Sequence, residues 1–226
     1  MSRLARVVCP NMPHHIVHRG NRREPIFFKD ADRRLYLSLL AKACPRYGLE
    51  VWSWCLMTNH VHLLLSPKDF VGLAKVMQWV ARNYSLKINK RNAWTGRLWE
   101  VRYFSCIIER DPYLWAVSAY IETNPVRAGL VSKPEQWEWS SARAHLFGEE
   151  DKYLKLKPWL TKEEMVEYNS FIYERLKEEH ISKIRKATSR GRPLATENFI
   201  VGLEKSLGRS LRPRKRGRKV KLKRTQ

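Results

Sequence analysis

The sequence predicts an α+β protein with a ferredoxin-like, split β-α-β antiparallel sheet that has helices on one face, followed by a helical, basic C-terminal extension. Three observations lead to this prediction. Short segments rich in β-branched and aromatic residues alternate with two long amphipathic segments in the order β-α-β-β-α-β. Only Thr58 and Asn59 separate the second and third strands, as in a hairpin. A further helix follows the last strand, and basic residues accumulate after it.

The first half of this unit contains three strands and one helix. A short strand covers residues 15–18. The helix over residues 30–47 begins with an aspartate, carries apolar residues at helical spacing and is stopped by Gly48. The strand over residues 49–57 is rich in strand-forming residues, and the strand over residues 60–65 is bounded by a nearby proline.

The second half adds another crossover helix and the fourth strand. Apolar residues at helical spacing predict a helix over residues 71–89, and residues 103–109 form the last strand. Asp111 and Pro112 open the next helix, because proline is tolerated in a first turn. That helix is expected to stop before Pro125.

The character of the chain changes beyond this unit. We assign residues 1–147 to one domain, residues 148–211 to a helical extension, and residues 212–226 to a basic tail that should be disordered without a partner. Within the extension, residues 162–186 have the composition of one highly charged helix, and residues 196–207 predict another short one.

Positive charge is in large excess. Lys and Arg outnumber Asp and Glu by 44 to 22 in 226 residues, which gives a net charge of +22 and a pI near 10.2. Residues 181–226 hold 16 of these basic residues against two glutamates, so this segment is an electrostatic arm on a moderately basic body. Such an excess favours a polyanion, and we expect nucleic acid as the partner.

Cysteine usage and hydropathy limit the cellular location. The four cysteines, Cys9, Cys44, Cys55 and Cys106, form neither a Cys-x-x-Cys motif nor a disulfide framework. This fits a reducing, cytoplasmic environment, in which a basic protein would associate with the nucleoid. The N-terminal residues lack the apolar region of a signal peptide, and no run of about 18 apolar residues predicts a membrane span.

His60 and His62 are the most informative pair in the sequence. They lie two apart in a predicted strand, so their imidazoles share one face and can reach one cation. Such a pair needs at least one further ligand to hold a metal. The alternative is that both are partly buried histidines bonded to backbone carbonyls.

Tyr120 and Asn124 have the spacing that places two side chains on one helix face. The Asn124 amide oxygen is a candidate third ligand, and the Tyr120 phenol is a candidate nucleophile unless it is simply packed in the core. Tyr103 and Tyr113 are rival nucleophiles, but neither has an amide or carboxylate four residues later. Phosphodiester chemistry usually recruits Mg²⁺ or Mn²⁺, so we expect one of these divalent metals.

Several basic side chains are candidate DNA contacts, since guanidinium groups bind phosphates and can read guanine edges. Arg97 and Arg102 flank Trp99, a mixture suited to unpaired bases, although Trp99 could equally be core. Arg127 either contacts nucleic acid or caps the C-terminal end of the helix that begins at Asp111. Residues 190–193, Arg-Gly-Arg-Pro, resemble the core of an AT-hook, with a plain electrostatic arm as the alternative. The full set is Arg19, Asn21, Arg22, Arg23, Arg97, Arg102, Arg127, Arg190 and Arg192.

Two segments carry a resemblance to a known family. Residues 57–64, Met-Thr-Asn-His-Val-His-Leu-Leu, and residues 120–131, Tyr-Ile-Glu-Thr-Asn-Pro-Val-Arg-Ala-Gly-Leu-Val, are similar to signatures of the REP-associated tyrosine transposases. These form a branch of the single-tyrosine HUH transposase superfamily. Residues 15–27 and 96–103 are similar to other parts of that family, and the resemblance runs collinearly over residues 5–147.

The resemblance implies a ferredoxin-like nuclease that cleaves and rejoins single-stranded or hairpin DNA, in which typical members recognise a palindromic repeat beside a short guide sequence. It implies that His60, His62 and Asn124 bind the metal and that Tyr120 forms a covalent phosphotyrosine. Thr58 departs from the family, which often has proline there. We expect a monomer or homodimer that has no membrane partner.

Two other functions fit part of the sequence. A basic DNA- or RNA-binding protein could use the same scaffold without catalysis, although the aromatic motif of an RNA-recognition module is not found. A replication-initiator nuclease shares the histidine pair and the tyrosine. It normally adds a helicase or other domains, which 226 residues are expected not to hold.

Overall fold

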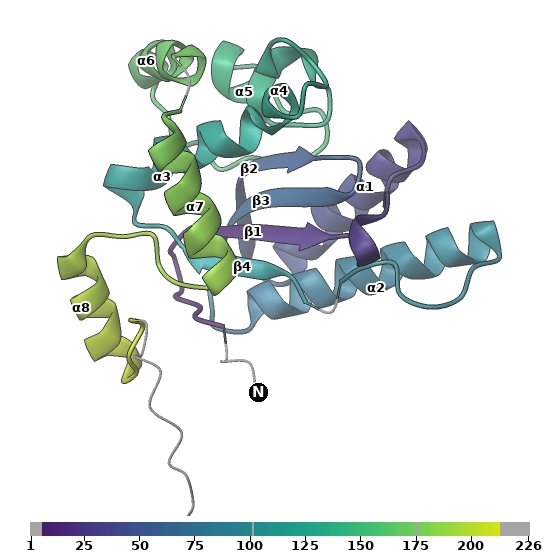
Figure 1. The fold of residues 1–226 in the computed structure, drawn as a ribbon, viewed down its shortest axis with the longest axis horizontal. Helices are drawn as coiled ribbons and strands as arrows, with labels where there is room; N and C mark the ends of the chain where they lie inside the picture. The colour runs from purple at the N-terminus through teal and green to yellow at the C-terminus, as the bar shows by residue number, and fades with distance from the viewer. Residues whose placement is uncertain (1–5, 101, 175, 213–226) are drawn as a thin grey trace, which may run out of the picture.

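The computed structural model describes residues 6–100, 102–174 and 176–212, and its centre is one antiparallel sheet in the order β2-β3-β1-β4 (Figure 1). The strands are β1 (His14–Arg19), β2 (Leu49–Leu56), β3 (His60–Pro67) and β4 (Phe104–Ile107). The elements between and after them are η1 (Asn21–Arg23), α1 (Asp30–Arg46), α2 (Gly72–Asn92) and α3 (Arg110–Glu122). The predicted β-α-β-β-α-β order and antiparallel pairing are confirmed.

The ends of the elements follow from local chemistry. The Asp32 carboxylate accepts hydrogen bonds from the backbone N–H groups of Phe28 and Lys29, which fixes the first turn of α1. The helix opened by Asp111 and Pro112 stops before Pro125, as predicted, because α3 ends at Glu122. Pro125 is the second residue of a separate short helix, α4 (Asn124–Arg127). A proline fits there because a first-turn N–H has no intrahelical partner.

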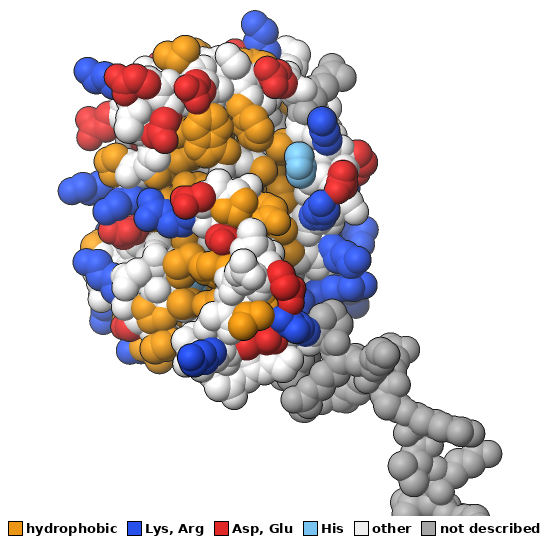
Figure 2. Space-filling view, turned by 90° about the vertical axis from the view of Figure 1, so that its left-hand side faces the viewer, with side chains coloured by type: hydrophobic (Ala, Val, Ile, Leu, Met, Phe, Trp, Pro, Cys, Tyr) orange, Lys and Arg blue, Asp and Glu red, His pale blue; other side chains and the backbone are white. Residues whose placement is uncertain are grey.

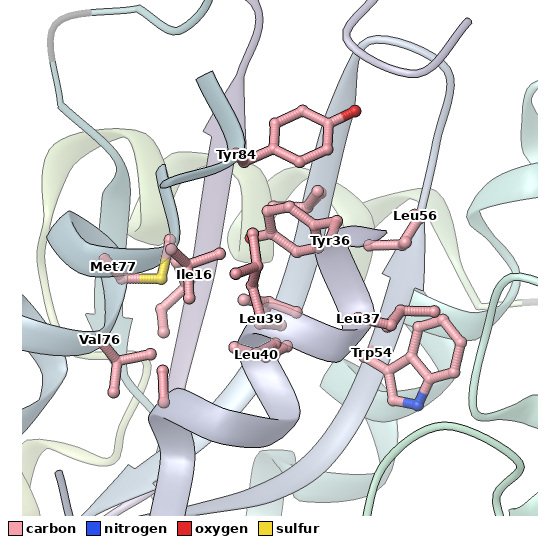
Figure 3. Packing of buried hydrophobic residues seen from close by; sticks show 14 of the residues in the cluster. Ile16, Tyr36, Leu37, Leu39, Leu40, Trp54, Leu56, Val76, Met77 and Tyr84 are labelled. Carbon is pink, nitrogen blue, oxygen red and sulfur yellow. The ribbon is translucent and has the colours of Figure 1, made fainter. Parts of the chain in front are cut away.

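One face of the sheet is covered by α1 and α2, as predicted. Ile16 of β1 and Trp54 and Leu56 of β2 point to this face and pack with Tyr36 of α1 and Met77 of α2 (Figure 3). These side chains are almost fully buried. Burial of each large apolar side chain contributes about 1.5–3 kcal/mol, so this cluster is the main source of stability for the unit.

The opposite face is covered as well, which the expectation of helices on one face did not include. Here α3 packs on β2 and β3, while α7 (Glu178–Arg190) crosses β1 and β4 (Figure 1). Cys55 of β2 and Leu64 of β3 meet Val117 of α3 and Ile184 of α7 in this second cluster. β2 and β3 therefore carry buried apolar side chains on both faces, as in sheets that are covered on both sides.

The extension consists of short helices. The prediction of one charged helix over residues 162–186 is wrong. This segment is two helices, α6 (Lys162–Tyr173) and α7. Buried Ile172 of α6 packs with Leu146, whereas Ile184 of α7 packs on the sheet. The two apolar stripes face different surfaces, so the chain turns between the helices. The remaining short elements are η2 (Pro134–Gln136), α5 (Ala142–Phe147) and α8 (Glu197–Leu207).

The C-terminal elements form much of the side of the molecule that lies on the left in Figure 1. On that side, acidic and basic side chains are interspersed around hydrophobic surface, so it is not a uniformly basic face (Figure 2). The predicted tail over residues 212–226 lies outside the described residues except for Arg212, which pairs with Glu204 at 3.6 Å. Within the described part of the chain, no helix is long and apolar enough to cross a membrane.

Candidate active site

His60 and His62 lie side by side at the start of β3, as their spacing predicts. Their ring centroids are 4.9 Å apart and the rings are steeply inclined. His60 is partly buried and His62 is almost fully buried on the face that α3 and α7 cover. Nδ1 of His60 donates to Oδ1 of Asn59 at 2.6 Å, which leaves Nε2 of His60 as the nitrogen with a free lone pair.

His15 is a third histidine of this group, and sequence reasoning missed it. Its Nε2 lies 3.0 Å from Nδ1 of His62, and the two rings stack with centroids 5.3 Å apart. Its other ring nitrogen, Nδ1, lies 2.8 Å from Oγ1 of Thr188 on α7. The chain separation of 173 residues between His15 and Thr188 explains why no local pattern reveals this contact.

Burial keeps these imidazoles neutral near pH 7. It lowers the pKa of His60 to about 4, with a smaller contribution from the positive charge of Arg19. Burial lowers the pKa of His15 to about 3, and it holds the pKa of His62 well below the usual value. A neutral imidazole has a lone pair to offer, which is the form that binds a metal.

Tyr120 on α3 faces the histidines. Its ring centroid lies 5.7 Å from those of both His15 and His62, with edge-on geometry in each case. The side chain is 6% exposed, because Ile184 of α7 belongs to the same apolar cluster. Residues from β1, β3 and α3, which are far apart in the sequence, therefore meet on this face of the sheet.

Arg127 holds the other side of the Tyr120 ring. Its guanidinium carbon lies 4.3 Å from the ring centroid, and its Nη2 donates to the backbone oxygen of Tyr120 at 2.7 Å. Burial lowers the pKa of Arg127, and the neighbouring Tyr120 opposes that shift. The guanidinium of Arg127 lies over the face of the Tyr120 ring. Of the two roles considered for Arg127, helix cap or DNA contact, the observed hydrogen bond corresponds to the first.

Asn124 begins α4, one helical turn after Tyr120. The hydrogen bond from the Thr123 N–H to the Ala119 oxygen and that from the Arg127 N–H to the Thr123 oxygen, 2.9 and 3.0 Å, keep this stretch close to helical. Nδ2 of Asn124 is buried and has no hydrogen-bond partner among the described residues. The unpartnered atom is a donor, so an acceptor such as a phosphate oxygen could satisfy it, whereas Oδ1 of Asn124 is the atom that could bind a metal.

The donor set fits a divalent metal. His60 and His62 each engage Nδ1 with a neighbour, so both can present Nε2 to a cation, and Oδ1 of Asn124 would supply the oxygen ligand. A set of two imidazole nitrogens and one amide oxygen suits a transition metal such as Mn²⁺, whereas Mg²⁺ would take most of its ligands from water and phosphate oxygens.

The rival tyrosines are placed less favourably. Tyr103 belongs to the cluster on the α1 and α2 face, where it lies under the guanidinium of Arg6. Tyr113 lies on α3 nearly two turns before Tyr120 and packs at the edge of the second cluster. Among the three tyrosines, Tyr120 is therefore the one in ring contact with the histidine pair.

Most of the predicted DNA-contacting residues near the start of the chain are exposed. The turn η1 is made of Asn21, Arg22 and Arg23, and it follows Gly20 and the partly buried Arg19. Arg97 and Arg102 are exposed as well. Trp99 between them is buried and stacks on His18 at a centroid distance of 4.3 Å, so this tryptophan is part of the core.

The AT-hook-like segment is docked on the sheet. The Leu194 N–H donates to the Ile107 oxygen at 2.8 Å, so the segment lies along the β4 edge. Arg192 donates from Nη1 to the Leu211 backbone oxygen, whereas Arg190 is exposed at the end of α7. Backbone pairing of this kind protects an edge strand.

Comparison with known proteins gives a consistent picture. A Haemophilus influenzae protein named as a REP-associated tyrosine transposase is 23% identical over 116 residues, which span 47% of this chain and 66% of that protein, just under two thirds of its length. The solved structure of a REP-associated tyrosine transposase bound to a REP hairpin has a TM-score of 0.56 at 17% identity, and the match covers 72% of this chain and 93% of that one. The latter similarity supports the fold.

A family model, described as Transposase IS200 like, matches residues 9–124. This region is just over half of the 226 residues, and it extends from the segment before β1 to Asn124. It includes the histidine pair, His15 and Tyr120, whereas Arg127 and Thr188 lie outside it. The chain therefore belongs to the IS200-like transposase family.

Proposed function

We propose that the protein cleaves and rejoins single-stranded or hairpin DNA through a covalent bond between Tyr120 and a DNA 5′-phosphate, with a divalent metal. One observation carries the proposal: the Tyr120 ring lies 5.7 Å from that of His62, which in turn lies 4.9 Å from the ring of His60. A nucleophile, two neutral nitrogen ligands and a positive charge are then close together in a strongly basic chain.

In the proposed reaction, the phenol oxygen of Tyr120 attacks a backbone phosphorus. The new oxygen–phosphorus bond replaces the bond to the 3′-oxygen, which leaves with a proton as a free 3′-hydroxyl. Arg127, whose guanidinium lies over the Tyr120 ring, supplies positive charge beside the attacking residue. Because the phosphotyrosine conserves the energy of the broken bond, a second 3′-hydroxyl can reverse the step and join strands.

His60, His62 and Asn124 would hold the metal. When bound there, a Mg²⁺ or Mn²⁺ ion would polarise a phosphoryl oxygen and orient the scissile group. All of these groups, together with Tyr120, belong to one chain, so a monomer can supply a full set. A palindromic hairpin is the proposed partner, since the similar solved structure is that of a transposase bound to a REP hairpin.

The first test uses labelled hairpin DNA with Mn²⁺ or Mg²⁺. We expect the wild-type protein to form a DNA adduct that survives denaturation. His60→Ala should lower the rate of DNA cleavage by about 100-fold or more, because a metal ligand is lost, while the affinity for DNA should change little. His180→Ala, which changes an exposed histidine of α7, is the matched control and should behave as wild type.

The outcomes of this test separate two functions. Equal loss of cleavage and binding in His60→Ala would assign that histidine to folding. Tight DNA binding by the wild type with no adduct in either metal would contradict catalysis and favour a non-catalytic DNA-binding protein.

A second test concerns the contacts that orient His62. His62 can present Nε2 only if its Nδ1 donates to His15, which then donates to Thr188. Thr188→Val keeps the shape of the side chain but removes the acceptor, so we expect the affinity for Mn²⁺ to fall about 10-fold. Titration calorimetry of the metal-free protein measures this.

Two further variants make the Thr188 result specific. Thr188→Ser retains the hydroxyl and should restore Mn²⁺ affinity, whereas Ser189→Ala alters an exposed neighbouring hydroxyl and should have no effect. Unchanged Mn²⁺ affinity in Thr188→Val, with the fold intact by circular dichroism, would show that the hydrogen-bonded chain does not control the ligand.

A further inference from the structure

A concave surface outside the histidine and tyrosine site lies where η1 meets the loop that follows α2. It is a hollow of about 320 Å³, and Phe28, Trp94, Asn21, Arg22 and Arg97 are among the residues that line it. This volume is at the small end of the range for small-molecule pockets, which suits one flat aromatic group.

The two aromatic side chains of this hollow are exposed and touch each other. Phe28 is 45% exposed and Trp94 is 48% exposed, and their ring centroids are 5.2 Å apart in an edge-to-face arrangement. Neither ring belongs to the buried clusters of the sheet. A tryptophan held at the surface beside a second ring offers a stacking platform to a planar ligand.

The backbone around Trp94 is fixed rather than loose. The Trp94 N–H donates to the Asn89 oxygen at 2.9 Å, and Nδ2 of Asn89 donates to the Gly96 oxygen at 3.0 Å. The Asn21 N–H donates to the Leu98 oxygen at 2.9 Å, which joins this loop to η1. The hollow therefore exists before a ligand arrives, which lowers the entropy lost on binding.

Two basic residues and one acidic residue, Glu24, line the hollow, which leaves a net positive charge, and one of the basic residues has a strained backbone. Arg22 and Arg97 are both exposed and line it. Arg22 has a φ of 53°, in the left-handed region that is costly for a residue with a long side chain. Such strain is typically retained at functional sites. Aromatic rings with guanidinium groups beside them are a combination that binds unpaired nucleotides.

Asn59 connects this surface to the histidine pair. Its Nδ2 donates to the Arg23 backbone oxygen at 2.8 Å, and its Oδ1 accepts from Nδ1 of His60 at 2.6 Å. One amide therefore bridges η1, which lines the hollow, and His60. A DNA strand whose phosphate lies at His60 can continue over η1 toward Trp94.

We propose that this hollow is a binding subsite for one unpaired nucleobase, which stacks on Trp94 while Arg22 and Arg97 bind the adjacent phosphates. The inference rests on the proposed function, because the base belongs to the same DNA strand that Tyr120 attacks. It assigns to Trp94 and Phe28 the stacking role for which the sequence had suggested the buried Trp99.

The test uses hairpin DNA with single-stranded flanks, selected from a random pool for tight binding, and with 2-aminopurine placed at each unpaired position in turn. Wild-type protein should quench the fluorescence at one position, because the base stacks on a ring. Trp94→Ala should abolish that quenching and weaken DNA binding about 5- to 150-fold, the range for loss of one base–aromatic stack. An abasic nucleotide at that position should weaken wild-type binding equally and should not weaken Trp94→Ala further.

Phe70→Ala is the matched control, because Phe70 is 60% exposed and precedes the opposite end of α2. It should leave quenching and affinity unchanged. Wild-type affinity in Trp94→Ala, or quenching that persists in that variant, would overturn the subsite. Adduct formation is measured on the same DNA: quenching that depends on Trp94 without any adduct would retain the subsite and refute the catalytic proposal. An adduct without such quenching would do the reverse.

Discussion

Tyr120→Phe should eliminate the covalent protein–DNA adduct and strand cleavage while leaving DNA binding intact. Phenylalanine keeps the ring that packs against His15 and His62 and under Arg127, so the fold and the site shape should persist. Only the attacking oxygen is lost. Removal of a nucleophile costs on the order of 10⁴-fold or more in rate, which would place the variant below detection.

The adduct is measured with DNA labelled at its 3′ end, because the 5′-phosphate of the downstream strand becomes attached to the protein. Tyr113→Phe, a change of the same chemistry on the same helix, is the control and should retain cleavage. An adduct formed by Tyr120→Phe at the wild-type rate would mean that another residue attacks, and Tyr113 would then be the next candidate on this face.

Glu122→Ala should cause a large loss of stability. The Glu122 carboxylate is fully buried and accepts hydrogen bonds from Ser141, His145 and Tyr168, at 2.6, 2.5 and 2.9 Å. These partners join the end of α3 to α5 and α6. Glu122→Ala would leave the donors of Ser141, His145 and Tyr168 buried without the carboxylate that accepts from them. We therefore expect the free energy of unfolding to fall by about 3–5 kcal/mol. That loss corresponds to roughly 6–20 °C in Tm for a domain of this size.

Thermal and urea unfolding measure this effect, and two variants bracket it. Glu122→Gln retains a buried acceptor oxygen and should lose less stability. Glu149→Ala breaks an exposed pair with Arg143 and should cost less than about 1 kcal/mol. If Glu122→Ala unfolded as late as Glu149→Ala, the carboxylate would not be holding these helices together.

The candidate site was predictable where its geometry is local. The period of two in β3 places His60 and His62 on one face, and the helical period places Tyr120 and Asn124 one turn apart. Both relations depend only on neighbouring residues. The same reasoning could not distinguish Trp94 from Trp99, because both lie in one basic, aromatic loop and their burial depends on which side chain reaches the core.

The amino-acid sequence by itself determined the order of strands and helices, the paired histidines, the tyrosine and the basic character of the chain. Only the tertiary structure decided that α7 covers the second face, that His15 and Thr188 orient His62, and that Arg127 lies on Tyr120. The physical reason is the range of the interactions. Periodicity and capping act over a few residues, whereas strand register and helix docking are set by packing among segments far apart in the chain.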